Sequence, residues 1–456
     1  MTQAGLHIEV TGGLSDWEIL QQENGYASTT VFGIISSDEK DDTEQQLFFS
    51  PQSMHVRIVN EADGSFVTPL LPVEVQDNAW HVLLKDIPCG GPYYLDVLML
   101  HREQGILYPL RGKKIRHFCV GDIYLIAGQS NAAGMGKGIA AETPEMGIHV
   151  LRDLKRWDIA TQPFCDSDYA KESMFLAFAK MVKKQTGYPI GLVPAAMGGA
   201  GLSRWLLSEE GDLYRKALQA VKFFCSGIRA VLWYQGCTDA GQCRETEEYL
   251  RRFCRFAADL RRDLNRNLPI FTFQLNRQKL RQPNERLDLG YSQIREAQRR
   301  VPQAVEGVYV LPAIDAVQMS DFIHSSSSSN HMLGQRLACQ ALNILYHKGL
   351  GIHPPEIVRA VCKGGQLLEM TFKNVDSFLY GFNCNMLPFQ IEDAHGPLKF
   401  TTGTVSGSTI TLSMDRPCVF PAYVSGQHGA DPLHYLIDFD TQLPMLCFHK
   451  FPIEKE

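Results

Sequence analysis

Two short segments of this chain carry residues that could together transfer an acyl group from an ester. Ser130 stands in the turn Gly128-Gln-Ser-Asn131, directly after an apolar strand pattern, and His324 follows Asp321 by three residues. A serine hydroxyl is a weak nucleophile until a base takes its proton. At this spacing, the Asp321 carboxylate can meet Nδ1–H of His324 and leave Nε2 free to act as that base. The residue types predict a serine esterase with Ser130, His324 and Asp321 as its catalytic set.

Acyl transfer also needs hydrogen-bond donors aimed at the oxyanion that develops on the carbonyl. The Ser130 amide is one candidate. Gly198 and Gly199 follow a second apolar strand pattern, and a glycine amide allows close approach because no side chain blocks it. Gln235 ends a third strand pattern and could offer its side-chain amide. We therefore expect an oxyanion hole formed by Ser130, Gly199 and Gln235.

Each of these residues also has a simpler interpretation. Ser130 could cap the helix that follows it, because serine favours that position. Asp315 ends the fifth strand pattern and rivals Asp321 as the residue that orients His324. Cys237 also follows a strand and is a rival nucleophile, although a buried, inert thiol is the simpler expectation. The five serines that follow His324 predict a mobile, solvated loop.

An alternating β/α pattern between about residues 119 and 350 explains how these residues could meet. Apolar strands alternating with amphipathic helices predict a parallel sheet covered on both faces, whose carboxyl ends share one edge. The fold class is therefore α/β, a flavodoxin-like three-layer domain. Strands are expected at 122–127, 189–194, 229–234, 269–275 and 307–313, and helices at about 170–185, 211–224, 245–264, 290–301 and 331–347.

The segments before and after this region consist of short strand-like runs separated by turn residues. Before it, Phe48-Phe49 and residues 55–59, 80–84 and 93–100 read as strands between turns, which predicts a β-sandwich. After it, residues 367–372, 409–413 and 434–438 read as strands. We therefore expect three domains: an N-terminal β-sandwich at 1–118, a catalytic domain at 119–350 and a C-terminal β domain at 351–456.

The motifs resemble the SGNH hydrolase superfamily and, more narrowly, the sialate O-acetylesterase family. The family pattern Gly-Asp-Val-Trp-x-x-x-Gly-Gln-Ser-Asn is matched by Gly121-Asp-Ile-Tyr-Leu-Ile-Ala-Gly-Gln-Ser-Asn131. Its Trp-Tyr-Gln-Gly-Glu is matched by Trp233-Tyr-Gln-Gly-Cys237. Its Ile-His-Pro, followed by Gly-x-Arg-Leu-Ala, is matched by Ile323-His-Ser325 and Gly334-Gln-Arg-Leu-Ala338.

The resemblance implies the same catalytic residues and hydrolysis of O-acetyl esters on sialic acids. Asn131, Arg204 and Trp205 become candidates for substrate binding, although a packing or salt-bridge role fits Arg204 and Trp205 equally well. Departures from the family pattern are Cys237 in place of Glu and Asp239 in place of Asn. Ala132 also stands where Met is usual. These changes bear on the substrate more than on the reaction.

Composition sets the remaining expectations. A net charge of −6 over 456 residues argues against a nucleic-acid footprint, and the pairs Arg251-Arg252 and Arg261-Arg262 read as a solvated helix face. No apolar run reaches the length of a membrane span, and no signal peptide is visible. The scattered cysteines favour free thiols in the cytoplasm. We expect no metal and no cofactor, and the oligomeric state is not predicted.

The sequence thus predicts a carbohydrate O-acetylesterase, most simply one acting on O-acetylated sialic acid through an acetyl-serine intermediate. An acetylxylan or other plant-glycan acetylesterase with the same catalytic residues is the alternative. A carbohydrate-binding protein whose hydrolase site has decayed is a more remote alternative. It would bind glycan without releasing acetate.

Overall fold

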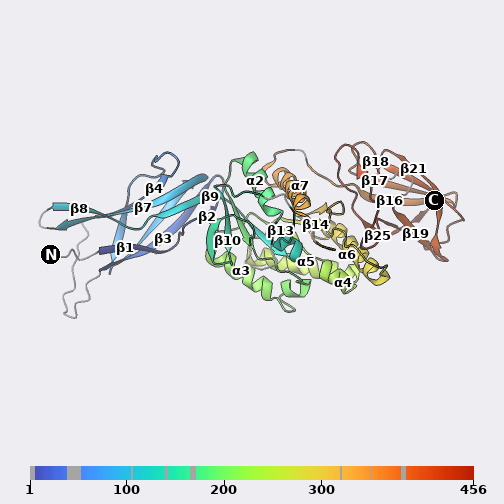
Figure 1. The fold of residues 1–456 in the computed structure, drawn as a ribbon, viewed down its shortest axis with the longest axis horizontal. Helices are drawn as coiled ribbons and strands as arrows, with labels where there is room; N and C mark the ends of the chain where they lie inside the picture. Colours follow the sequence, from blue (N-terminus) through green and yellow to red (C-terminus); the bar gives the residue numbers. More distant parts are fainter. Residues whose placement is uncertain are drawn as a thin grey trace.

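A computed structural model describes residues 6–37, 53–103, 106–138, 142–164, 171–318, 321–349, 351–381 and 387–456. These residues form three hydrophobic cores that follow one another along the long axis of the molecule (Figure 1). The N-terminal strands enclose the first core, an α/β layer the second, and the C-terminal strands the third. The molecule has a mixed α/β fold with large sheets, as predicted. The predicted Phe48-Phe49 strand lies outside the described residues.

One long strand connects the first two cores. β9 (Ile115–Gly128) pairs antiparallel with β7 (Gly90–Glu103) over its first half. Its second half pairs in parallel with β12 (Ile190–Pro194) on one side and β13 (Ala230–Tyr234) on the other. The predicted boundary between 118 and 119 therefore falls within a continuous strand, and the domain boundaries themselves stay a prediction.

The central sheet is parallel in the order β10, β12, β9, β13, β14, β15. Its last two strands are β14 (Ile270–Gln274) and β15 (Val308–Pro312), and all five predicted strands are present. The sequence pattern missed β10 (Ile148–Arg152) and β11 (Arg156–Ile159), which pair antiparallel at the edge of the sheet. Both strands are short and follow a segment without clear alternation, so they gave no period to detect.

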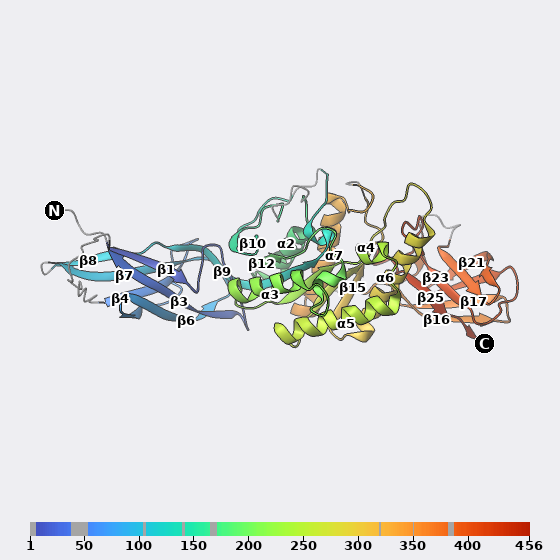
Figure 2. The ribbon, with the colours of Figure 1, turned by 90° about the horizontal axis from the view of Figure 1, so that it is seen from below.

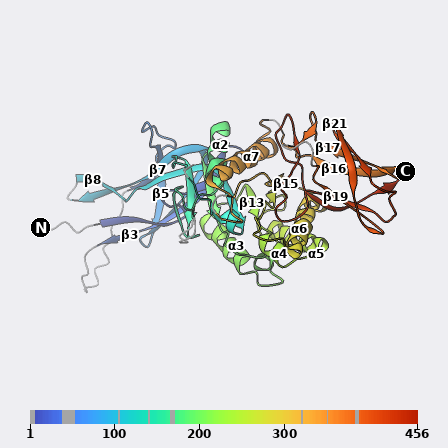
Figure 3. The same cartoon turned by 45° about the vertical axis from the view of Figure 1, so that its right-hand side comes forward.

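Helices cover both faces of this sheet. α2 and α7 lie on one side, and α3, α4 and α5 lie on the other (Figure 3). All five predicted helices are present within a few residues of their expected ends. The helices are α1 (Ser130–Ala133), α2 (Phe175–Thr186), α3 (Asp212–Phe224), α4 (Cys237–Gly241), α5 (Thr246–Asp263), α6 (Glu285–Ala304), α7 (Ser327–Tyr346) and the 3-10 helix η1 (Leu202–Trp205).

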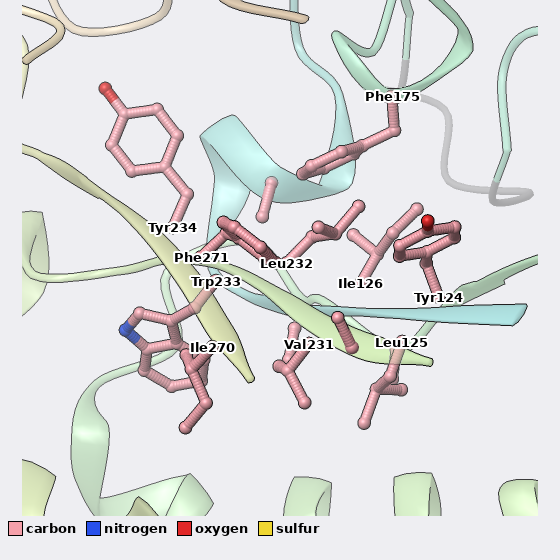
Figure 4. Packing of buried hydrophobic residues seen from close by; sticks show 14 of the residues in the cluster. Tyr124, Leu125, Ile126, Phe175, Val231, Leu232, Trp233, Tyr234, Ile270 and Phe271 are labelled. Carbon is pink, nitrogen blue, oxygen red and sulfur yellow. The ribbon is translucent and has the colours of Figure 1, made fainter. Parts of the chain in front are cut away.

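The period of two in a strand explains the packing of the central core. Tyr124 and Ile126 of β9 point toward Phe175 of α2, whereas Leu125 and Val231 point to the opposite face (Figure 4). All of these side chains are at most 1% exposed. Because both faces are covered, β9 and β13 are apolar at almost every position, as the sequence pattern required.

The flanking sheets are antiparallel for the most part. The remaining N-terminal strands are β1 (Leu6–Gly12), β2 (Ile19–Gln21), β3 (Tyr26–Ser37), β4 (Ser53–Asn60), β5 (Leu71–Gln76), β6 (Ala79–Pro88) and β8 (Ile106–Arg111). The C-terminal strands are β16 (Glu356–Lys363), β17 (Leu367–Lys373), β18 (Leu379–Tyr380), β19 (Phe389–Asp393), β20 (Gly396–Leu398), β21 (Phe400–Ser406), β22 (Thr409–Met414), β23 (Tyr423–Gly426), β24 (Ile437–Asp438), β25 (Phe448–Pro452) and β26 (Glu454–Lys455).

A buried arginine ties the C-terminal segment to the central sheet. Arg295 of α6 is 0% exposed and donates to the carbonyls of Leu275 and Asn276, which follow β14. The same guanidinium donates to the carbonyls of Gly429 and Ala430. β25 lies beside α6 at this junction (Figure 2). The C-terminal strands therefore support the edge of the sheet at which β14 ends.

One expectation about the helix surfaces is wrong. Arg252 of α5 is buried, and its guanidinium binds the carboxylates of Glu209 and Asp239. Arg251 beside it is exposed, as predicted. An arginine can be buried when carboxylates pair with it, and a sequence pattern does not reveal such distant partners.

We predict that Gly128→Ala destabilises the protein by about 2 kcal/mol or more. Gly128 has φ +128, and a Cβ there would lie 2.2 Å from the backbone oxygen of Tyr234 on the neighbouring strand. Urea unfolding of Gly128→Ala and Gly12→Ala measures the difference, because a Cβ at Gly12 meets nothing within 4 Å. Equal stability of the two variants would contradict the close approach of β9 and β13.

Candidate active site

A cavity of about 1020 Å³ lies at the carboxyl edge of the central sheet. Ser130, Gly199, Asp321 and His324 all line it, although they come from four distant parts of the chain. The parallel sheet brings them together because β9 and β12 end at the same edge. The structure therefore places the three predicted catalytic residues and one predicted oxyanion residue around one space.

Ser130 begins α1, immediately after β9. Gln129 occupies the N-cap position with an extended backbone, and its amide donates to the Tyr234 carbonyl at 2.9 Å. The N-cap position belongs to Gln129 and not to Ser130, so helix capping does not account for this serine. Ser130 is 7% exposed and lines the cavity, which leaves its hydroxyl accessible to a small ester.

Asp321 accepts three hydrogen bonds from the loop that carries His324. Its Oδ2 lies 2.6 Å from His324 Nδ1, and its Oδ1 accepts from the amides of Ile323 and His324, both at 2.8 Å. Burial alone would raise the pKa of Asp321, but the two amides and the His324 ring outweigh it and hold that pKa below its usual value. A charged carboxylate at Nδ1 fixes the tautomer in which Nε2 can accept a proton.

Two buried asparagines fix the loop that carries His324. Asn276, just after β14, donates from Nδ2 to the Ile323 carbonyl at 2.9 Å. Asn131 Oδ1 accepts from the Ser325 amide at 3.3 Å. Asn131 is 3% exposed and is absent from the residues that line the cavity. The structure thus does not place Asn131 against a substrate. It connects α1 to the His324 loop instead.

Two backbone amides at the cavity are available as hydrogen-bond donors. Among the described residues, neither the Ser130 amide nor the Gly199 amide has a hydrogen-bond acceptor. Gly199 has φ +70, and its carbonyl accepts from Thr238 Oγ1 at 3.1 Å, which fixes the turn. Donors that are already oriented need no rearrangement when charge develops on a carbonyl oxygen.

The third predicted oxyanion donor lies elsewhere. Gln235 is 0% exposed and does not line the cavity. Its Nε2 donates to Asp239 Oδ2 at 2.6 Å, and its Oε1 accepts from the Tyr249 hydroxyl at 2.9 Å. The side-chain amide is therefore used in the core beneath the site. The strand-end position suggested a role in the cavity, but the side chain points into the protein.

The other two proposed substrate-binding residues also lie outside the cavity wall. Trp205 is 1% exposed and packs edge-on against Trp233, with ring centroids 5.3 Å apart. Arg204 forms a two-pronged ion pair with Asp212, at 2.5 and 3.1 Å. The structure supports the alternative of packing for Trp205 and a salt bridge for Arg204.

Two further ambiguities are resolved by distant partners. Asp315 accepts from both terminal nitrogens of Arg336, at 2.7 and 3.0 Å, and not from His324. The serine tract is not a solvated loop, because Ser325, Ser326, Ser327 and Ser329 are buried. Ser326 is the N-cap of α7 and accepts from the Ser329 amide. Serine favours this capping position, and the tract therefore begins a helix.

Comparisons with known proteins place this site in a family. Residues 120–343 match the family of carbohydrate esterases described as sialic acid-specific acetylesterases. This segment, slightly less than half of the chain, is similar to that carbohydrate esterase family. The match contains Ser130, Gly199, Asp321 and His324. It supports an esterase that acts on carbohydrates.

Two individual proteins are similar. A probable carbohydrate esterase of Arabidopsis thaliana is 34% identical over 175 residues, which cover 32% of this chain and 66% of that protein. The chain therefore spans slightly less than two thirds of that relative. A crystal structure of a carbohydrate acetylesterase from Xanthomonas citri covers 97% of this chain and 99% of its own, with a TM-score of 0.68 and 22% identity. This second likeness shows a shared fold.

Next to Ser130, Gln129 has a structural role that sequence reasoning missed. Its side-chain oxygen accepts from the amides of Gly236 at 3.0 Å and Thr238 at 3.4 Å, which links α1 to α4. Gln129 belongs to the same turn as Ser130, so the motif contained the signal without indicating the partner. Lys171 and Lys216 also line the cavity, and no motif marked either.

The cavity contains no evident metal site. Among the parts of the chain that the structure describes, no three histidine, cysteine or carboxylate side chains cluster as metal ligands. Likewise, no helix of the described residues is long and apolar enough to cross a membrane.

We predict that Asp321→Asn lowers kcat by about 10²- to 10⁴-fold, because the amide no longer selects the His324 tautomer with a free Nε2. Initial rates on a neutral acetyl ester measure the loss. Full activity in the variant would exclude the orienting role.

The lowered pKa of Asp321 also predicts a pH dependence of stability. Its contribution to the free energy of unfolding is present above the pKa of an aspartate in the unfolded chain, about 4, and is lost as the pH falls through the folded pKa. Asp321→Asn should therefore lose less stability than the wild type when the pH is lowered through that range.

We predict that Cys237 resists alkylation by iodoacetamide at neutral pH and that activity survives the treatment. Cys237 lines the cavity, but burial raises the pKa of its thiol to about 11, so almost no thiolate is present. Peptide mass spectrometry locates the modification, and the urea-denatured protein serves as the positive control. Rapid labelling of Cys237 with parallel loss of activity would return it as a candidate nucleophile.

Proposed function

We propose that this protein hydrolyses O-acetyl esters on carbohydrates, with O-acetylated sialic acid as its substrate, through an acetyl-Ser130 intermediate. One observation carries the proposal: Ser130 shares a cavity with a histidine whose Nδ1 is held by a carboxylate at 2.6 Å. Nucleophile, base and orienting group are the three parts that acyl transfer from serine requires.

In the first step, Ser130 Oγ attacks the acetyl carbonyl carbon while His324 Nε2 takes the hydroxyl proton. The oxyanion accepts hydrogen bonds from the amides of Ser130 and Gly199. The bond between the carbonyl carbon and the sugar oxygen then breaks, and His324 returns the proton to that oxygen. The deacetylated sugar leaves, and the acetyl group stays on Ser130.

In the second step, water replaces the sugar. His324 takes one proton from the water, whose oxygen attacks the acetyl carbon. The same two amides hold the second oxyanion. The bond to Ser130 Oγ breaks, His324 returns the proton to that oxygen, and acetate leaves. Asp321 stabilises the imidazolium in both steps without itself gaining a proton.

The sialic acid assignment draws on the description of the matched family, which is specific for sialic acid. The plant-glycan alternative draws on the Arabidopsis relative, a probable carbohydrate esterase. The two alternatives share every catalytic residue named above. They differ in the sugar that carries the acetyl group, so substrate preference separates them.

We predict that wild-type protein releases acetate from 9-O-acetylated sialic acid and that Ser130→Ala reduces the rate by at least about 10³-fold. Mass spectrometry of the acid-quenched wild type should show one added acetyl group on the peptide that contains Ser130. Ser328→Ala is the matched control, because Ser328 is exposed and does not line the cavity.

Several outcomes would contradict parts of this proposal. Acetate release from acetylated xylan but not from acetylated sialic acid would select the plant-glycan alternative. Glycan binding without any acetate release would select the decayed, carbohydrate-binding alternative. Full turnover by Ser130→Ala would remove Ser130 as the nucleophile.

A further inference from the structure

The charges on the cavity wall differ from those of the whole molecule. Three lysines, Lys137, Lys171 and Lys216, line the cavity, together with the carboxylates Asp153 and Asp321. Asp321 is already paired with His324 at 2.6 Å. The chain as a whole carries a net charge of −6, so positive charge is locally enriched around the site.

Lys171 and Lys216 form no ion pair with any residue that the structure describes. By contrast, Lys180 and Lys183 of α2 each pair with a glutamate, at 2.5 and 2.6 Å. Lys216 lies on α3, and Lys171 precedes α2 on the opposite face of the sheet. Two ammonium groups without an ion-pair partner among the described residues therefore flank the cavity from two separate elements.

A second, smaller cavity of about 240 Å³ shares Lys171 and Lys137 with the first and is also lined by Gln162 and Glu172. Burial raises the pKa of Glu172. The larger cavity alone exceeds what an acetyl group needs, so there is room for the sugar that carries the ester and for groups attached to it.

We propose that Lys171 and Lys216 bind a carboxylate of the substrate, so that this esterase selects acidic acetylated saccharides over neutral ones. The inference rests on the proposed function and adds the residues that set its specificity. Lys171 and Lys216 are exposed residues at the wall of the cavity, so an anion that enters the cavity meets two ammonium groups. A sialic acid and a uronic acid both supply the required carboxylate.

The test compares a substrate that carries a carboxylate with its uncharged methyl ester. Acetate release is measured from 9-O-acetylated sialic acid and from the methyl ester of its carboxyl group. Acetylated galacturonate oligosaccharides form a third arm, which distinguishes a uronic acid from a sialic acid. We expect the wild type to prefer a carboxylate-bearing substrate, with a KM that rises with salt concentration.

The Lys171→Gln, Lys216→Gln double variant should raise KM for the acidic substrate by about tenfold with little change in kcat, because uniform binding is lost. KM for the methyl ester should stay constant. Lys222→Gln is the matched control, because Lys222 lies on the same helix α3 but does not line the cavity. A merely structural role for the lysines would alter both substrates equally, and that result overturns the inference.

A further measurement separates this inference from the proposed function. Free sialic acid and galacturonic acid are tested as competitive inhibitors of p-nitrophenyl acetate hydrolysis, with their methyl esters as controls. Weaker inhibition by the acids in the double variant supports the lysine site even if no acetylated saccharide is turned over. Equal inhibition of wild type and double variant, or a wild-type preference for the methyl esters, refutes the site while leaving the Ser130 chemistry intact.

Discussion

The parallel pairing of β9 with β12 and β13 is the constraint on which the site depends. β9 is buried along its second half and ends at Gly128, where a side chain would meet the Tyr234 backbone at 2.2 Å. This close approach sets the turn that begins α1 with Ser130. The same strand pairs with β7 and β2, so the N-terminal sheet and the esterase site share one backbone element. A shift of β9 would move Ser130 and the N-terminal strands together.

Buried polar residues beneath the cavity hold the segments around Leu202, Gln235 and Asp239 together. Asp239 Oδ2 accepts from the Leu202 amide and from Gln235, and Asp239 Oδ1 accepts from Arg252. A buried charge is costly unless it is paired and its hydrogen bonds are satisfied, and here both conditions hold. Asp239 stands where the family pattern that the motifs resemble has Asn, and Arg252 supplies the positive partner that a carboxylate requires. We infer that the substitution is accommodated below the site and not in the substrate cavity.

The His324 loop is supported from outside the chemistry. Asn276 holds its backbone, and Arg295 holds Asn276 while also reaching the C-terminal segment at Gly429. The C-terminal strands are thus connected to the His324 loop through two buried side chains. The proposed esterase activity therefore depends on structure far from the reacting atoms, since a base must stay within reach of Ser130.

The sequence by itself determined the α/β class, the five principal strands and the residues around which a serine esterase can be built. These features are local: an apolar run specifies a buried strand, and Asp321 reaches His324 because three residues separate them. Tertiary structure alone decided which side chains line the cavity. Gln235, Asn131 and Trp205 are buried elsewhere, and Asp315 and Arg252 have partners far along the chain, because the direction of a side chain at a strand end depends on its packing. The sequence also did not indicate that Lys171 and Lys216 line one cavity. Charged residues on separate elements come together only when the fold places those elements around the same space.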